Sequence, residues 1–459
     1  MGSLITISLL AIVILYLGLF KANKSLLPVS VLGLLGALVF AVSEWNSFAP
    51  PIYSGMIQFD NFAIAFSGIT IFSTVLIFLL SKDYFEVISE NVAEYYSIIL
   101  FALAGIIVMV SYHNLSMLFI GIEIMSVSLY ILAGIKKRDF ASNEAALKYF
   151  LMGAFSTGFL LFGITLLYGA TGSFDLDGIR LYLLANPTNL TPLFYSGVIL
   201  LIVGLCFKIG AAPFHFWAPD VYEGSPTLIT TFMSTVVKTA GFAAFLRLFS
   251  FCFVPLQDFW MPVLLVITII TLFIGNITAV YQQSMKRMLA YSSISHVGYM
   301  LFAIVALGKN SGNSVFLYAA AYSVASIIAF AVVILLQKQT GSDTFESFNG
   351  LSKKNPFLAF TLTIAMLSLA GIPLTAGFIG KFLMFGQALE QYHLWLVIIA
   401  VVNASIGIYY YFKVIIAMYF RDNEMLHLTV PVYYRLVLTL STAITILLGV
   451  YPGLLTNLL

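Results

Sequence analysis

The sequence predicts an all-α polytopic membrane protein with about 14 transmembrane helices, and three observations predict this class. First, the chain of 459 residues is 61% hydrophobic and 9% charged, whereas a soluble domain carries about 25% charged residues. Second, apolar runs of about 20 residues, enough to cross a bilayer, follow one another along the chain. Third, the connections between the runs are short. This composition excludes a soluble enzyme and a disordered chain, and leaves no extramembrane domain for a redox centre or a nucleotide.

The apolar runs predict fourteen approximate spans. They cover residues 4–20, 27–43, 61–81, 96–112, 114–135, 144–170, 193–213, 226–249, 259–281, 288–307, 313–337, 356–389, 395–420 and 432–457. The run at 356–389 is too long for one ordinary span and contains Gly371 and Pro373, so it is interpreted as one interrupted span. The first run is expected to remain a span, because no basic residue precedes it and no small-residue cleavage site follows it.

The basic residues of the connections predict the orientation in the membrane. The odd-numbered connections and adjoining helix ends hold thirteen Lys and Arg residues, while the even-numbered ones hold Arg180, Arg247 and Lys309. Basic connections face the cytoplasm. The odd connections are therefore expected in the cytoplasm, and both termini on the opposite side.

The net charge of +2 offers no basic surface for nucleic acid. Cys206 and Cys252 lie in apolar runs without CxxC or Cys/His spacing, which predicts neither a disulfide framework nor a metal or cluster site.

Ionisable residues inside the spans are the main functional signal. Five lysines fall there, Lys148, Lys208, Lys238, Lys381 and Lys413, against two acids, Glu123 and Glu144. Each such residue costs about 2.5 kcal/mol or more at the bilayer centre and usually faces the bundle interior or water. A lysine influenced both by burial and by a nearby carboxylate can exchange its proton near neutral pH, whereas arginine stays charged. The surplus of lysines therefore indicates proton transfer.

Structural explanations remain open for some of these residues. Lys413 lies eight residues before Arg421, so its side chain can reach the cytoplasmic interface. Lys148 follows Glu144 by four residues, which permits an ordinary ion pair on one helix face. Lys208, Lys238 and Glu123 lie near mid-span, where the interface is out of reach and a functional role is favoured.

Two spans are predicted to break near a lysine. In the seventh, Pro213 follows Lys208; in the twelfth, Gly371 and Pro373 precede Lys381. Proline removes a backbone hydrogen bond, and the freed carbonyl is tolerated in a membrane only beside polar groups. An ordinary proline kink is the alternative at either site.

The two breaks lie five spans apart, which predicts inverted repeats with a transport site. Spans 4–8 (96–250) and 9–13 (258–420) are expected to form these five-helix repeats, between a three-helix segment (1–95) and a C-terminal helix (430–459). His296, in MKRMLAYSSISHVGYM, can also exchange protons near neutral pH, although a purely structural histidine is the alternative.

Three motifs carry a resemblance to a known family. PFHFWAPDVYEGSPT after Lys208, MKRMLAYSSISHVGYM and AGIPLTAGFIGKF resemble the antiporter-like subunits of respiratory complex I, an NADH-quinone oxidoreductase. Within that family the chain is more similar to the N branch than to M or L. The Asp-Val-Tyr-Glu-Gly loop, Lys381 where M typically has glutamate, and the chain end after span fourteen favour N.

The resemblance implies roles for single residues. It implies that Glu123 and Lys208 form a switchable pair, that Lys238 relays protons, and that Lys381 leads to the far exit. Lys148, His296 and Glu144 match accessory polar positions of the same motifs.

The resemblance also implies a setting for the chain. The chain would hold no cofactor or metal, while NADH, FMN, iron–sulfur clusters and quinone would belong to partner subunits. The expected partners are the other membrane and peripheral subunits of the complex, especially neighbouring antiporter-like subunits, in a bacterial inner membrane. A subunit of an Mrp-type sodium/proton antiporter is the nearest alternative, and a structural membrane subunit without transport is another.

Overall fold

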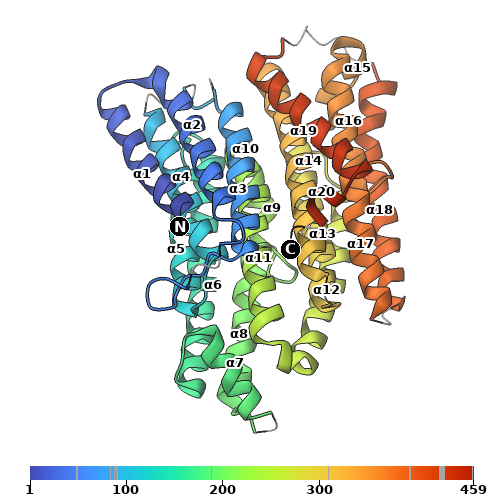
Figure 1. Ribbon diagram of the computed structural model, residues 1–459. Helices are drawn as coiled ribbons and strands as arrows, with labels where there is room; N and C mark the ends of the chain where they lie inside the picture. Colours follow the sequence, from blue (N-terminus) through green and yellow to red (C-terminus); the bar gives the residue numbers. More distant parts are fainter. Residues whose placement is uncertain are drawn as a thin grey trace.

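The computed structural model describes the chain except residues 48–49, 83, 87, 89–90, 188, 309, 392–393, 423–428, 457 and 459. Lys309, which was counted in the predicted orientation, therefore lies outside the described residues. Within the described part, thirteen helices are long and apolar enough to cross a membrane. Figure 1 shows them as one bundle of roughly parallel and antiparallel helices. The predicted all-helical membrane architecture is confirmed.

The first half of the chain contains the helices α1 to α11, which include the first eight spans. Its helices are α1 Gly2–Leu19, α2 Asn23–Ser43, α3 Asn61–Leu80, α4 Val92–Val110, α5 Leu115–Ala133, α6 Phe140–Thr171, α7 Leu176–Ala185, α8 Pro192–Ile209, α9 Trp217–Gly224, α10 Thr227–Phe232 and α11 Lys238–Arg247. Two π-helical turns, Met233–Val237 and Leu248–Cys252, make α10 and α11 into one span of 26 residues.

The second half of the chain contains the remaining helices. They are α12 Gln257–Val280, α13 Met285–Val305, α14 Ser311–Thr340, α15 Leu351–Lys354, α16 Pro356–Ala370, α17 Ala376–Glu390, α18 Leu394–Phe420, α19 Val432–Val450 and α20 Gly453–Thr456, with 3-10 turns at Val254–Leu256 and Phe345–Phe348. The twelfth span is interrupted as predicted. The last span was predicted to reach residue 457, but α19 ends at Val450, because Pro452 cannot continue the helix.

Side-chain caps explain where several helices begin. The side chains of Asp60, Asn114, Thr191 and Ser284 accept hydrogen bonds from backbone N–H groups in the first turns of α3, α5, α8 and α13. Such caps satisfy donors that have no partner within the helix. Asp60 also accepts two hydrogen bonds from Arg247, at 3.0 and 2.6 Å, which ties the N-terminal segment to α11.

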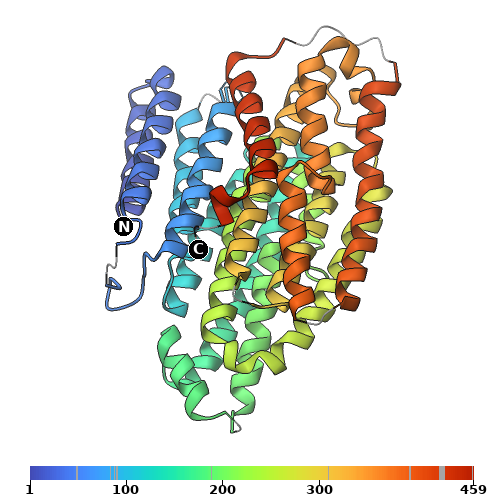
Figure 2. The same ribbon diagram turned by 45° about the vertical axis from the view of Figure 1, so that its right-hand side comes forward.

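Burial divides the bundle into a centre and a rim. The most apolar windows of Thr227–Cys252 and Ser311–Thr340 are completely buried, whereas only 28% of the windows in α1 and α2 is buried. Figure 2 shows α1 and α2 at one edge of the bundle. The central helices α10–α11, α13 and α14 are therefore shielded from lipid by other helices of the same chain.

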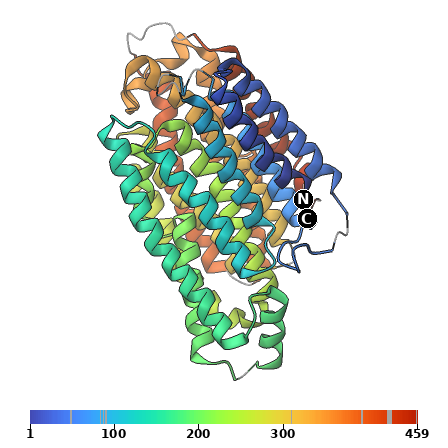
Figure 3. The ribbon, with the colours of Figure 1, turned by 90° about the vertical axis from the view of Figure 1, so that its left-hand side faces the viewer.

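One end of the bundle carries the basic connections, and we call it the basic side. It holds α15 and the connections around Lys136, Ser284 and Asp343; Lys82, Lys136 and Lys338 line one cavity there. In Figure 3, α7 lies at the opposite end.

Candidate functional site

The seventh span breaks at a glycine. The helix α8 ends at Ile209, and Gly210 follows with a positive φ of 75°, a conformation that costs other residues about 1–2 kcal/mol. The Gly210 N–H bonds the Phe207 carbonyl and the next N–H bonds the Cys206 carbonyl, which closes the last turn. The prediction placed the break at Pro213, which lies within the non-helical stretch. The residue that ends the helix is Gly210, in the Gly-Ala-Ala step between Lys208 and Pro213.

Lys208 lies in the last turn of α8 and is buried. Its Nζ donates to Ser126 Oγ on α5 at 2.9 Å and to Thr157 Oγ1 on α6 at 3.3 Å. Sequence reasoning did not identify these two hydroxyls. Ser126 lies one turn after Glu123 on the same helix face, and this spacing was the available signal.

Glu123 is not in direct contact with Lys208. The ion pairs within 4.0 Å formed by the described residues do not include these two, although the carboxylate lies within electrostatic range of the lysine. Glu123 Oε1 is buried and accepts no hydrogen bond from the described residues. The direct pair that the resemblance implies is therefore not formed here, and hydroxyl groups contact the ammonium instead.

Lys238 is the first residue of α11 and is 1% exposed. Its Nζ donates to Ser293 Oγ on α13 at 2.6 Å and lies 5.5 Å from the ring centroid of Tyr222 on α9. The π-helical turn Met233–Val237 immediately precedes it. Such turns are rare and often occur at functional sites, and no feature of the residue pattern had predicted this one.

Polar residues on one side of α13 lie between the contacts of Lys238 and those of Lys381. Ser293, His296 and Tyr299 follow at three-residue intervals, which advance about 4.5 Å per step along a helix. Ser293 accepts the hydrogen bond of Lys238, and Nζ of Lys381 lies 4.6 Å from the centroid of the Tyr299 ring. We call these three residues of α13 the polar ladder.

His296 occupies the middle of the polar ladder and is buried. Its Nδ1 lies 2.5 Å from the Tyr318 hydroxyl, and its Nε2 lies 2.9 Å from the Tyr411 hydroxyl. Tyr411 also pairs with Ser292. Hydroxyl and imidazole groups can each donate and accept hydrogen bonds, so this cluster can exchange protons by small rearrangements.

Lys381 lies beyond the second break and caps the helix before it. Gly371 ends α16 with a positive φ of 84°, and both Gly371 and Pro373 lie in the predicted gap between α16 and α17. The Nζ of buried Lys381 donates to the carbonyls of Leu369 and Ala370 at 3.1 and 3.0 Å. As the last carbonyls of α16, they receive no hydrogen bond from N–H groups of the same helix. The Lys381 ammonium supplies the missing donor.

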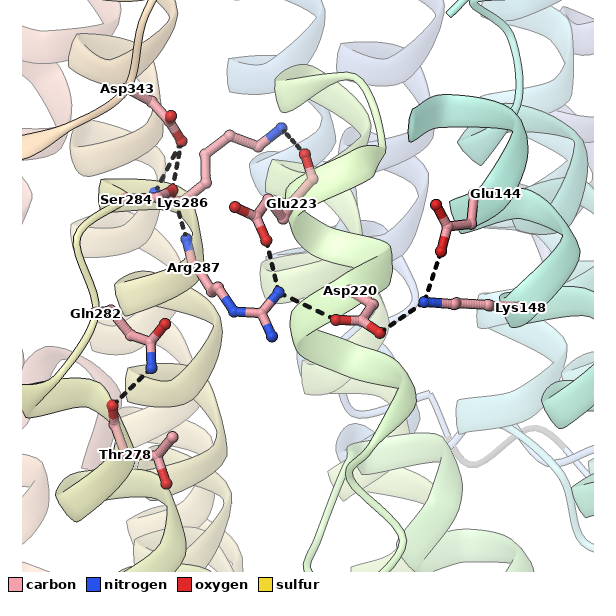
Figure 4. A network of polar contacts seen from close by, with 10 residues as sticks. All are labelled: Glu144, Lys148, Asp220, Glu223, Thr278, Gln282, Ser284, Lys286, Arg287 and Asp343. Atoms are coloured by element: carbon pink, nitrogen blue, oxygen red, sulfur yellow. Dashed lines mark hydrogen bonds and ion pairs between the residues drawn. The ribbon is translucent and has the colours of Figure 1, made fainter. Parts of the chain in front are cut away.

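Glu144 and Lys148 form the predicted ion pair but belong to a wider network. Figure 4 shows that Lys148 contacts both Glu144, at 2.8 Å, and Asp220 on α9, at 2.9 Å. Arg287 on α13 contacts Asp220 at 3.0 Å and Glu223 at 2.6 Å. The side chain of Lys148 is 42% exposed in this chain. Sequence reasoning identified the Glu144–Lys148 pair but not Asp220, Glu223 and Arg287.

Lys413 behaves as a residue that reaches toward the helix end. Its Nζ donates to the Gln282 carbonyl at 3.3 Å and lies 4.3 Å from the ring centroid of Phe345. Both partners lie on the basic side, next to the 283–285 and 343–345 contacts. Cys206 and Cys252 are buried and free. Within the described residues, no cluster of three or more His, Cys, Asp and Glu side chains could hold a metal.

A family model, related sequences and solved structures all indicate the same family. The family described as NADH:quinone oxidoreductase/Mrp antiporter, TM, matches residues 112–407. The chain is 42% identical to NADH-quinone oxidoreductase subunit N of Flavobacterium psychrophilum over 100% of both chains. It is 41% identical to the corresponding subunit of Cytophaga hutchinsonii, over 100% of this chain and 99% of that one.

Solved structures agree with the sequence comparisons. A chain of respiratory complex I from Thermus thermophilus is similar with a TM-score of 0.84 and 32% identity, covering 99% of this chain and 98% of that chain. A chain of the Mrp complex from Dietzia sp. has a TM-score of 0.88 at 18% identity, covering 100% and 95%, which shows the shared fold alone.

Proposed function

Because the chain belongs to the NADH:quinone oxidoreductase/Mrp antiporter family and is related over its whole length to N-type subunits, we propose that it translocates protons in the membrane arm of an NADH:quinone oxidoreductase. The redox chemistry takes place in partner subunits, which hold NADH, FMN, iron–sulfur clusters and quinone. The other membrane and peripheral subunits, especially antiporter-like neighbours, are the proposed partners. The chain itself contributes the buried lysines and their hydrogen-bonding groups.

The polar ladder is the observation that carries this proposal. It places hydroxyl and imidazole groups between the ammonium groups of Lys238 and Lys381, in helices that are shielded from lipid. A purely structural set of lysines has no need for such a connection. Proton transfer requires groups that can alternately donate and accept. The hydroxyl and imidazole groups of the ladder are of this kind, and the Tyr318 and Tyr411 hydroxyls extend them at His296.

Glu123 is the proposed control point. When its carboxylate approaches Lys208, two unit charges about 4 Å apart interact by about 4 kcal/mol at an effective dielectric of about 20. This interaction holds the proton on Lys208. In the arrangement described here the ammonium contacts Ser126 and Thr157 instead, so a proton can pass toward Lys238 and then along the polar ladder to Lys381.

The orientation and the repeats belong to the same proposal. We place the basic side in the cytoplasm of a bacterial inner membrane, with both termini on the other side. The segments 96–250 and 258–420 are proposed as inverted repeats. The matched helix ends at Gly210 and Gly371, each with a positive φ and the same pattern of closing hydrogen bonds, support this assignment.

The experiment that tests the function is replacement of Lys238 in the assembled complex. Lys238→Ala should lower NADH-driven proton pumping in membrane vesicles at least tenfold while the complex still assembles. Lys413→Met is the matched control, because it removes a lysine that lies outside the proposed proton path. Full pumping by a correctly assembled Lys238→Ala complex would identify the chain as a structural subunit.

An Mrp-type antiporter subunit is the second candidate, since the matching family includes such proteins. That function predicts sodium-dependent proton exchange without NADH. We expect NADH-dependent pumping that persists when sodium is removed.

A further inference from the structure

The helix α9 lies between the first two lysines of the proposed path. At its start, Trp217 Nε1 donates to the carbonyl of Phe207 at 3.0 Å, beside Lys208. Near its end, the Tyr222 ring faces the ammonium of Lys238, 5.5 Å from the ring centroid. No hydrogen bond between described residues joins Lys208 to Lys238 directly. The position of α9 therefore determines how the two lysines are linked.

This helix cannot be positioned by its own backbone alone. It has eight residues, and non-helical segments separate it from α8 and α10. Its buried face, with Trp217, Val221 and Tyr222, packs into the bundle, and two acidic side chains on the other face tie it to neighbouring helices. Asp220 accepts hydrogen bonds from Lys148 on α6 and from Arg287 on α13, and Glu223 accepts a further one from Arg287. Figure 4 shows α9 held between its two neighbours by these contacts.

We propose that Glu144, Lys148, Asp220, Glu223 and Arg287 form a charged clamp that positions α9 between Lys208 and Lys238, and so controls proton transfer between them. The inference rests on the proposed function, and it assigns positioning roles to Asp220, Glu223 and Arg287, for which the sequence had given none. The clamp joins α6 of the first predicted repeat to α13 of the second.

Asp220 is the central member of the clamp. It contacts both basic residues, whereas Glu144 contacts Lys148 alone and Glu223 contacts Arg287 alone. The side chains are 31–45% exposed in this chain, so a single pair among them stabilises little by itself. A carboxylate shared between two cations on different helices couples their positions, and its loss releases both contacts together.

The two breaks also place Asp220 and Lys381 at matching positions. Asp220 follows Gly210 by ten residues, and Lys381 follows Gly371 by ten. In the second repeat the side chain at this position turns back to cap α16. In the first repeat it points outward to two neighbouring helices, so this half-helix is held from outside. This difference supports a positioning role for Asp220.

The clamp is tested by neutralising Asp220 in the full complex. Asp220→Asn should lower NADH-driven proton pumping in vesicles about fivefold or more, with normal subunit content. Asp220→Glu retains the charge and should recover at least half of the pumping. The exchange variant with Asp220→Arg and Arg287→Asp should pump better than either single change, because it restores one attractive pair. Asp422→Asn, in the exposed Lys353–Asp422 pair, is the control and should pump normally.

The outcomes distinguish failure of the clamp proposal from failure of the proposed proton translocation. If Lys238→Ala abolishes pumping but Asp220→Asn pumps normally, the clamp is wrong and the proton path stands. If both variants pump normally, the proposed function itself fails. Equal losses with Asp220→Asn and Asp220→Glu would also overturn the clamp, since charge then has no role. Should Asp220→Asn not assemble, Arg287→Gln, which retains the Lys148–Asp220 pair, serves the same test with a smaller expected loss of about threefold.

Discussion

The two broken spans share a backbone and differ in how they use a lysine. Each first half-helix ends in a glycine of positive φ, with the same closing hydrogen bonds. Lys208 precedes its glycine and donates to the hydroxyls of Ser126 and Thr157. Lys381 follows its glycine and donates to two backbone carbonyls. The two breaks therefore have similar backbones, but one ammonium group lies among hydroxyls and the other against backbone carbonyls.

The two lysines differ in the chemistry of the groups that accept their hydrogen bonds. A hydroxyl can accept from an ammonium or donate to a neutral amine, whereas a carbonyl can only accept. The partners of Lys208 can thus serve the lysine before and after it loses a proton. The partners of Lys381 serve it only as a donor, so its second role is to hold the end of α16 together.

Lysine-to-arginine changes give the sharpest test of this comparison and the largest expected effect. Lys208→Arg should lower proton pumping at least tenfold, because arginine stays charged. Lys381→Arg should do the same while leaving the thermal stability of the complex near normal, since a cation still caps the carbonyls. Proton pumping and thermal unfolding are measured on the same vesicles. Near-normal pumping by Lys381→Arg would reduce Lys381 to a cap and exclude it from the path.

Replacing each of the two glycines by alanine distinguishes the strain of a positive φ from a steric contact with the Lys381 side chain. Both Gly210→Ala and Gly371→Ala should destabilise the chain by about 1–2 kcal/mol, since each glycine has a positive φ. The loss should be greater at Gly371, where the new Cβ would lie 2.9 Å from Cδ of Lys381, against 3.8 Å to the nearest atom at Gly210. Thermal unfolding of the purified complex gives both values. Equal losses would show that the lysine simply moves aside.

Removal of the hydroxyl partners of Lys208 should have a moderate effect. Ser126→Ala and Thr157→Val each remove one hydrogen bond, worth about 0.5–1.5 kcal/mol net, so each should lower pumping about two- to fivefold. The double change should lower it further. Ser405→Ala, which removes an exposed hydroxyl bonded to its own helix, is the control. The pumping rate as a function of pH is the measurement, and an unchanged profile in the double variant contradicts the role given to these hydroxyls.

The smallest effect is expected at Lys413. Lys413→Met removes a lysine bonded to one carbonyl near the basic side, so pumping should change less than twofold. A larger loss, measured beside Lys238→Ala, would extend the path to a residue that the structure places outside it.

The sequence predicted the architecture and the ionisable residues, because both depend on composition at known depth in a membrane. Apolar runs located the spans, and mid-span lysines needed no alignment to be noticed. The break at Gly371 was equally visible beside Pro373. Pro213 likewise lies within the observed break between α8 and α9, and the helix end itself falls at Gly210, because glycine readily adopts the left-handed conformation of a helix end.

The partners could not be predicted, because they come from helices distant in the sequence. Thr157 is 51 residues from Lys208, and Asp220 is 72 residues from Lys148. The sequence pattern also gave no reason to expect that Lys381 would cap a helix whose last residue lies 11 positions earlier. Such contacts depend on how the bundle packs, which residue spacing alone does not encode.

The π-helical turn before Lys238 gives this span one residue more than a regular helix of the same length would hold. A π-helical turn of this kind can move to a neighbouring position along the same helix. A shift by one position would turn the Lys238 side chain by about 100° around the helix axis, while the two ends of the span remain where they are. The π-helical turn thus sets the side of the span from which the Lys238 side chain projects.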